Sequence, residues 1–108
     1  MTDDYQIHIP PSFVAVHADR RGRLTIPLQE LRERYDLCED LAAGLVEFAQ
    51  GVHHGLGVAE DEVLARCRRG LLQAPAQVEP GEARWVERRL AELLGWPWLG
   101  QDEADGPS

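Results

Sequence analysis

Apolar residues recur at intervals of three and four positions through residues 28–52, and this pattern predicts a long amphipathic helix. The recurring positions are Leu28, Leu31, Tyr35, Cys38, Ala42, Leu45, Ala49 and Val52. Three further apolar residues widen the stripe, namely Leu37, Leu41 and Phe48. A stripe this wide favours packing against two neighbours. We expect an unbroken helix over about residues 27–52, ending where three glycines punctuate residues 51–57.

Charge order and glycine positions predict two further helices. Residues 59–70 begin with three acids and end with three arginines, an order that complements the helix dipole. Gly70 is then the expected stop. Residues 80–95 begin at Pro80, which suits the first helical turn, and end at Gly95, which suits a C-terminal cap.

The two ends of the chain predict less regular structure. Residues 5–26 alternate apolar and polar side chains only briefly, and Pro10-Pro11 interrupts any strand, so we expect an extended arm with a turn at residues 19–22. Residues 101–108 are acidic and poor in apolar groups, which predicts a disordered tail. The predicted fold class is therefore all-α: a compact three-helix bundle in one domain, residues 1–100, with the first helix as its spine.

The inward positions of the three helices predict the core. The candidates are Leu31, Tyr35, Cys38, Leu41, Leu45, Phe48, Val63, Leu64, Cys67, Val86, Leu90 and Leu93.

Composition excludes several function classes. The chain of 108 residues has 44% hydrophobic and 28% charged residues and a formal net charge of −8, with arginine as its only cation besides histidine. The negative charge disfavours unspecific binding to nucleic acid. Absence of lysine removes Schiff-base chemistry and the P-loop lysine. No apolar run is long enough for a membrane span, and the acidic start lacks a signal peptide pattern, so we expect a cytoplasmic protein without membrane contact.

Candidate catalytic groups are few and scattered. Cys38 and Cys67 fall in predicted helices without a nearby partner at metal-site spacing, which favours buried reduced thiols. His53-His54 follows Glu47 by about two helical turns, but adjacent histidines in a glycine-rich turn are typical of exposed side chains. We therefore expect no enzyme, no cofactor and no metal.

Three arginine clusters keep a DNA-binding alternative open. One lies in residues 14–37, VAVHADRRGRLTIPLQELRERYDL, which resembles the first half of AbrB-type swapped-hairpin transcription factors. Arg20, Arg21 and Arg23 match that family's basic turn, and Gly22, Ile26 and Pro27 match its framework. The resemblance implies a strand on each side of the turn, whereas the second strand pair of that family has no counterpart here. A helix-turn-helix corner at Gly57 and Val63 is a second form of this alternative.

Four longer segments resemble a small proteobacterial family of uncharacterised proteins. They are IPPSF (residues 9–13), RYDLCEDLA (34–42), LGVAEDEVLARCRRGLL (56–72) and ARWVERRLAELLGWP (83–97). Members of that family often carry the name "ATPase with chaperone activity". The resemblance implies a link to an ATP-driven chaperone, although this chain lacks the P-loop motif and is not itself expected to hydrolyse nucleotide.

Arginine and tryptophan dominate the energetics of many protein interfaces, and this chain has three tryptophans. We therefore predict a protein-protein interaction, adaptor or regulatory module. The candidate partner-binding residues are Arg21, Arg23, Arg68, Arg69, Trp85, Arg88, Trp96 and Trp98. In the alternative interpretation the tryptophans seal the bottom of the bundle. The wide apolar stripe of residues 28–52 would also support a homodimer.

Overall fold

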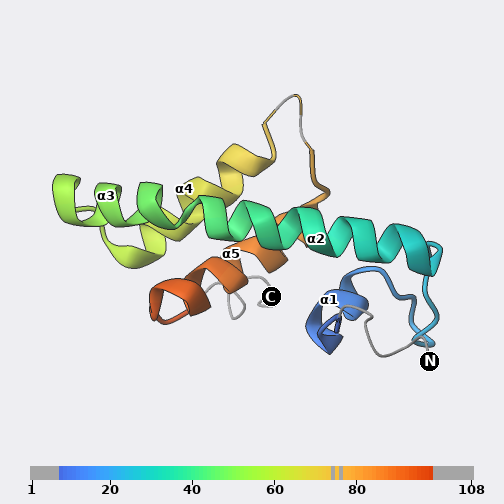
Figure 1. Cartoon of the computed structure of the whole chain (residues 1–108). Helices are drawn as coiled ribbons and strands as arrows, with labels where there is room; N and C mark the ends of the chain where they lie inside the picture. The colour runs from blue at the N-terminus through green and yellow to red at the C-terminus, as the bar shows by residue number, and fades with distance from the viewer. Residues whose placement is uncertain (1–7, 74, 76, 99–108) are drawn as a thin grey trace.

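The computed structural model describes residues 8–73, 75 and 77–98. Five helices follow one another: α1 (Pro11–Val16), α2 (Leu28–Gly44), α3 (Val46–Leu56), α4 (Glu60–Leu71) and α5 (Pro80–Leu94). Within the described ranges the only pairing of extended backbone is an isolated antiparallel bridge between Ala18 and Leu24. The predicted all-α class is confirmed, and the predicted tail at residues 101–108 lies outside the described residues (Figure 1).

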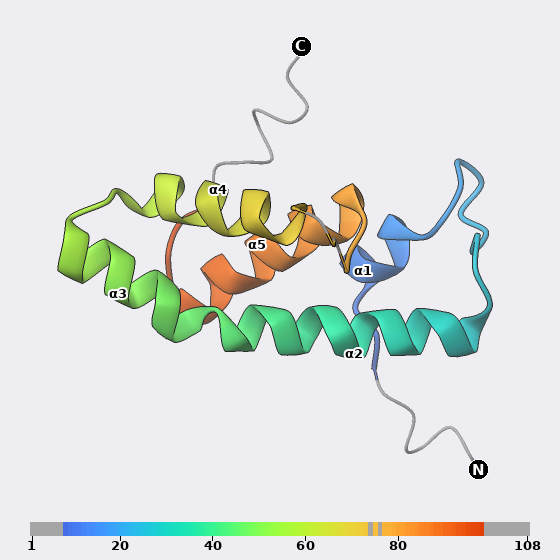
Figure 2. The same cartoon turned by 90° about the horizontal axis from the view of Figure 1, so that it is seen from above.

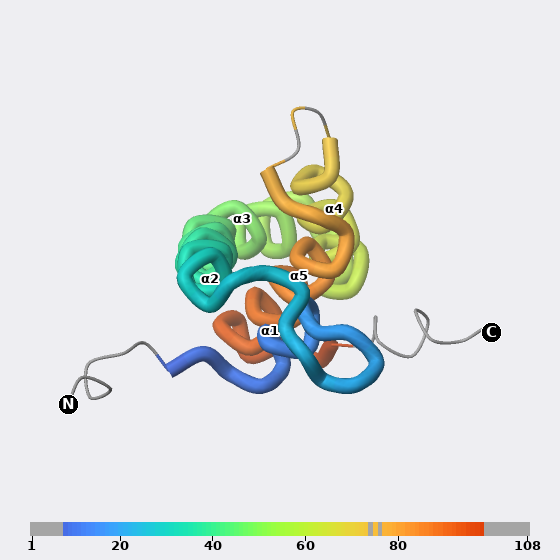
Figure 3. Tube along the Cα trace, turned by 90° about the vertical axis from the view of Figure 1, so that its right-hand side faces the viewer, coloured from blue at the N-terminus to red at the C-terminus, as the bar shows by residue number. Residues whose placement is uncertain are grey.

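Helix α5 lies at the centre of the molecule. It contacts each of the other four helices, and the end-on view shows them arranged around it (Figure 3). Its buried residues are Glu82, Ala83, Trp85, Val86, Glu87, Leu90 and Ala91. The prediction that residues 27–52 form the spine is therefore wrong, because α5 is the helix that buries side chains on several faces.

The predicted unbroken helix over residues 27–52 is divided into α2 and α3. The chain bends at Leu45 (Figure 2), whose backbone N–H donates to both Leu41 O at 3.1 Å and Ala42 O at 3.2 Å. Gly44 immediately precedes the bend, and its low helix propensity favours a break in the helix at this turn. Helix α3 then continues beyond the predicted end to Leu56, where Gly57 adopts a left-handed conformation at φ 72°.

The predicted extended arm contains helix α1, so that prediction is wrong over residues 11–16. Pro10 is the extended N-cap residue and Pro11 occupies the first helical position, where a missing N–H costs nothing. The brief alternation of apolar and polar residues suggested extended backbone, but Phe13 and Val16 are three positions apart, which is also a helical spacing. Phe13 is fully buried and ties this short helix to the core.

A tight hairpin turn follows α1 and confirms the predicted turn at residues 19–22. Asp19 N–H donates to Arg23 O at 2.8 Å, and Thr25 N–H donates to His17 O at 2.8 Å. Gly22 has φ 85°, a left-handed conformation that favours glycine. The first strand implied by the AbrB-type resemblance is absent over residues 14–16, because those residues belong to α1.

Helices α4 and α5 lie close to their predicted positions. Gly95 ends α5 in a left-handed conformation with φ 74°, as predicted. Gly70, the predicted stop of α4, instead lies inside its last turn, and Leu72 is the C-cap residue. No described helix is both long and apolar enough to cross a bilayer.

Two apolar clusters share α5. The first joins α1, α2 and α5 around Phe13, Leu31, Cys38, Ala42, Val78, Ala83, Trp85 and Val86. The second joins α3, α4 and α5 around Ala49, Val63, Leu64, Cys67, Leu90 and Ala91. Seven of the core candidates are buried: Leu31, Cys38, Val63, Leu64, Cys67, Val86 and Leu90.

The remaining core candidates lie nearer the surface. Tyr35, Leu41 and Leu45 are partly buried against the first cluster. Phe48 and Leu93 are 52% and 41% exposed, so their prediction as core residues is wrong. The neighbouring helices cover only part of the apolar stripe of residues 28–52. The bend at Leu45 places the two halves of the stripe in different clusters.

Candidate functional site

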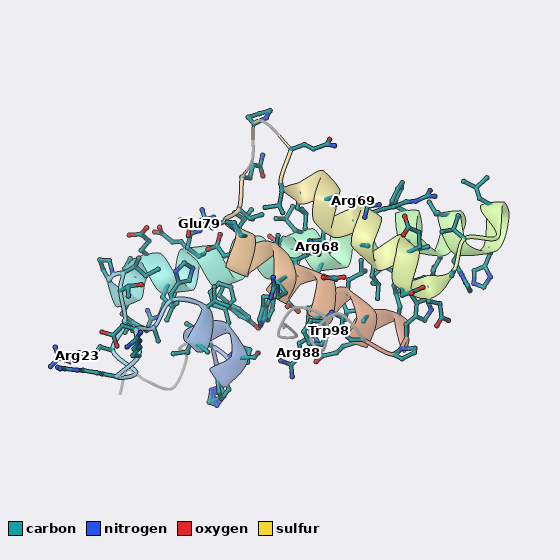
Figure 4. All side chains as sticks on the ribbon, turned by 180° about the vertical axis from the view of Figure 1, so that it is seen from behind. Arg23, Arg68, Arg69, Glu79, Arg88 and Trp98 are labelled. Atoms are coloured by element: carbon teal, nitrogen blue, oxygen red, sulfur yellow. The ribbon has the colours of Figure 1, made fainter. Side chains whose placement is uncertain are left out.

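The predicted partner-binding residues fall in separate places. Figure 4 shows Arg23 at one end of the molecule, Arg68 and Arg69 on α4, and Arg88 beside Trp98 under α5. The structure therefore brings together only part of the predicted set. That part consists of Trp85, Arg88 and Trp98. Ser12 and Arg84, which were not among the predicted partner-binding residues, also line this site.

Trp85 forms the floor of the site. It is 7% exposed, and its ring meets the Phe13 ring edge-on at 5.1 Å between centroids and the Tyr35 ring at 5.8 Å. Its indole N–H donates to Ser12 Oγ at 2.9 Å. Because that hydrogen bond uses only an acceptor site of the hydroxyl, the Ser12 hydrogen can still be donated to a ligand.

Arg88 and Trp98 form the side of the site. The guanidinium carbon of Arg88 lies 5.4 Å from the centre of the Trp98 ring, a cation-π arrangement. Arg88 is only loosely paired within the chain, because its Nε is 3.9 Å from Glu92. Arg84 is exposed, and among the described residues no carboxylate lies within ion-pair distance of it. Both cations can therefore take an external anion.

Two adjoining hollows open at this position. One has a volume of about 260 Å³ and reaches Tyr35 and Arg89, and the other has a volume of about 140 Å³ and reaches Arg84 and Trp98. Ser12, Trp85 and Arg88 line both hollows. We call the surface formed by the two hollows the α1–α5 groove.

The far wall of the α1–α5 groove is held by Arg89. Its guanidinium donates to Glu39 at 2.9 and 3.0 Å and to Glu92 at 3.0 Å. These hydrogen bonds raise the pKa of Arg89, chiefly through Glu39. Arg89 therefore links α2 to α5 and is not available for a ligand, which leaves Arg84 and Arg88 as the available cations.

A buried charged cluster lies at the opposite end of α1, and the sequence did not predict it. Glu82 is fully buried, accepts from Arg34 Nη2 and Nε, the latter at 2.9 Å, and lies 2.7 Å from His17 Nε2. The backbone N–H of Glu79 also donates to Glu82, at 3.0 Å. A hollow of about 490 Å³ lies over His17 and Arg34.

Hydrogen bonding keeps Glu82 ionised despite its burial. Burial alone raises the pKa of its carboxyl, but the Arg34 guanidinium, the Glu79 N–H and His17 outweigh that effect and lower the pKa to about 2. An ionised carboxylate only accepts hydrogen bonds, so His17 Nε2 carries the hydrogen that it donates to Glu82. With its acceptors occupied, Glu82 fastens α1 and α2 to α5 rather than forming a reactive site.

The arginines of α4 are engaged within the chain. Arg68 Nε donates to Glu87 at 3.0 Å, and Arg69 Nη2 donates to Glu62 at 3.0 Å. Glu87 is buried, and burial raises the pKa of its carboxyl against the opposing effect of Arg68. Arg68 therefore stabilises a buried charge on α5, which reduces its availability for a partner.

Trp96 and the hairpin arginines lie apart from the α1–α5 groove. The Trp96 ring packs on His53 at 5.0 Å between centroids and covers the second apolar cluster. Arg21 and Arg23 are exposed at the hairpin, where their backbone N–H groups both donate to the Asp19 side chain at 2.9 Å. The hairpin is thus a second, separate positive surface.

Candidate catalytic groups do not converge. Burial raises the pKa of Cys38 to about 12 and that of Cys67 to about 11, so both thiols stay protonated at neutral pH. His53 Nδ1 donates to Val58 O at 2.7 Å. In the part of the chain that the structure describes, no three histidine, cysteine or acidic side chains are arranged to hold a metal ion.

No protein family model matches this chain, and no curated protein and no solved structure is significantly similar to it.

Proposed function

We propose that the protein is a non-enzymatic adaptor or regulatory module that binds an acidic segment of a partner protein in the α1–α5 groove. The observation that carries this proposal is the position of Arg84 and Arg88 beside the aromatic surface of Trp85 and Trp98. Tryptophan and arginine are among the residue types enriched at the positions that dominate interface energetics.

The shape of the α1–α5 groove indicates what it would bind. A hollow of about 260 Å³ lies below the roughly 300 to 1,000 Å³ typical of small-molecule sites, and it suits one anchoring side chain. Tyr35 and Trp85 supply its aromatic walls. The partner segment that fits best therefore places one aromatic or large apolar residue beside acidic residues that meet Arg84 and Arg88.

The groove is held in place before any partner arrives. The hydrogen bond from Trp85 to Ser12 fixes α1 on α5, and the Arg89–Glu39 pair fixes α2 on α5. Preorganisation of this kind lowers the entropy cost of binding. A module with such a surface suits a cytoplasmic accessory role, and the family resemblance favours an ATP-driven chaperone as the partner's class. Exposed Phe48 supports the homodimer as a further proposal.

The proposal is tested with short labelled peptides that place one tryptophan beside a run of aspartates, and with matched asparagine peptides. We expect binding only of the acidic peptides, and binding at least roughly tenfold weaker in the Arg84→Gln/Arg88→Gln variant, since each charged contact contributes about 1 kcal/mol. Arg66→Gln/Arg69→Gln on α4 is the matched control, with the same change in net charge. Equal losses in both double variants, or binding insensitive to salt, would contradict the proposal.

The exposed arginines of the hairpin favour DNA binding as a second candidate function. Arg20, Arg21 and Arg23 lie within four positions of one another on an otherwise acidic chain. If this function is correct, duplex DNA binds in the presence of competitor, affinity falls steeply with salt, and Arg21→Gln/Arg23→Gln removes it. The overall charge of −8 makes this the less favoured candidate.

A further inference from the structure

We propose that residues 101–105 of the same chain compete with the partner for the Arg84–Arg88 side of the α1–α5 groove. This inference rests on the proposed function and names a regulator of the same site. Its occupant is the acidic segment QDEAD, which carries Asp102, Glu103 and Asp105 and no cation. The module would thus carry a weak competitor of its own partner.

Chain continuity supports this occupant. The described residues run to Trp98, which itself lines the groove against Arg88. Asp102 follows Trp98 by four residues, and four residues span at most roughly 14 Å, so the segment begins within reach of the cation pair. A covalent tether this short gives an effective concentration on the order of millimolar.

Charge complementarity supports the same occupant. Arg84 and Arg88 are the cations of the groove that the chain leaves available, whereas Arg89 is held by Glu39 and Glu92. The three carboxylates of residues 101–105 can meet both cations without any loss of an existing close ion pair.

The segment can fill only half of the groove. Residues 101–105 contain no aromatic or large apolar side chain, so the hollow of about 260 Å³ stays open to the anchoring residue of a partner. If the segment binds this side with a dissociation constant on the order of millimolar, a millimolar effective concentration gives roughly half occupancy. Half occupancy lowers the apparent affinity for a partner only about twofold. The segment would therefore compete weakly with purely acidic ligands, whereas a ligand that has both acid and aromatic groups can also fill the open hollow.

The hairpin arginines are the alternative binding site for this acidic segment. Arg23 lies at one end of the molecule, whereas Arg88 and Trp98 lie near its middle (Figure 4). A short tether therefore favours the groove, and a measurement that locates the segment separates the two possibilities.

The test is paramagnetic relaxation in the full chain, with a nitroxide attached to Ala104→Cys. Buried Cys38 and Cys67, with pKa values of about 12 and about 11, resist labelling at neutral pH, and the unsubstituted chain treated in the same way is the control. We expect broadening of the signals of Ser12, Arg84 and Arg88. Neutralising the segment with D102N/E103Q/D105N, or adding Arg84→Gln/Arg88→Gln, should reduce it.

Three results would overturn the inference: broadening centred on the hairpin, uniform broadening, or broadening that is unchanged by neutralisation of the segment. The inference can fail while the proposed function holds. If acidic peptides bind equally well to the neutralised and the unsubstituted chain, and Arg84→Gln/Arg88→Gln still abolishes that binding, then the groove is a partner site without a resident competitor.

Discussion

Replacing Glu82 with glutamine should cost about 3 kcal/mol of stability at pH 7. The carboxyl is fully buried, and its pKa is lowered from 4.5 to about 2 in the folded protein. A difference of this size between the unfolded and folded pKa corresponds to about 3 kcal/mol in favour of the folded state. Glutamine keeps the shape but leaves the Arg34 guanidinium without a charged partner.

The pH dependence distinguishes this reasoning from a simple packing defect. Because the folded pKa of Glu82 is below the unfolded value, its contribution is complete above pH 4.5 and is lost as pH falls toward 2. The stability gap between the natural chain and Glu82→Gln should therefore narrow by about 2 kcal/mol between pH 7 and pH 3.

Urea unfolding followed by circular dichroism measures the stability gap at pH 7 and its decrease at pH 3. Thermal unfolding gives a second measurement: at pH 7, Glu82→Gln should lower the midpoint by roughly 12 to 24 °C for a domain of this size. Glu33→Gln is the matched control, since Glu33 is exposed and contacts only the Gln29 amide among the described residues. A gap below about 1 kcal/mol at pH 7, or a gap that does not change with pH, would refute the reasoning.

Three other predictions concern packing, glycine conformation and thiol chemistry. Phe13→Ala should cost about 3 to 5 kcal/mol in urea unfolding because the side chain is fully buried; a loss below about 1 kcal/mol would show that α1 is dispensable. Gly95→Ala should destabilise the chain by about 1 kcal/mol because φ is 74°, whereas Gly51→Ala should stabilise α3 by up to about 1 kcal/mol because nothing lies near its added methyl group. Stability changes of the same sign in the two glycine variants, measured by thermal unfolding, would contradict these two predictions. Cys38 and Cys67 should react with iodoacetamide at pH 7 only on unfolding, and rapid modification of the native chain, detected by mass spectrometry, would contradict their burial.

Local signals in the sequence were sufficient for the helices α4 and α5. Acids open α4 and arginines close it, and Pro80 and Gly95 bracket α5, so each signal acts within one or two turns of the residue that carries it. The turn at residues 19–22 is of the same kind, because Asp19 and Gly22 determine it between them.

Tertiary contacts decided the parts of the fold that the sequence pattern left open. Helix α1 has six residues, too few to be stable alone, and it is held by the burial of Phe13 and by the hydrogen bond from His17 to Glu82. The bend at Leu45 likewise follows from packing the two halves of one apolar stripe into two different clusters. Neither contact is visible from periodicity, because the partners lie far apart in the chain.

The candidate site shows the same division between local and long-range information. Sequence alone established an all-helical, acidic, lysine-free chain, and residue type alone nominated Trp85, Arg88 and Trp98. Only the fold placed Ser12 against Trp85, separated Arg88 from the arginines held by carboxylates, and buried Glu82 between α1 and α2. The physical reason is that helix formation depends on neighbours within about four residues, whereas a groove and a buried ion pair depend on which helix faces meet.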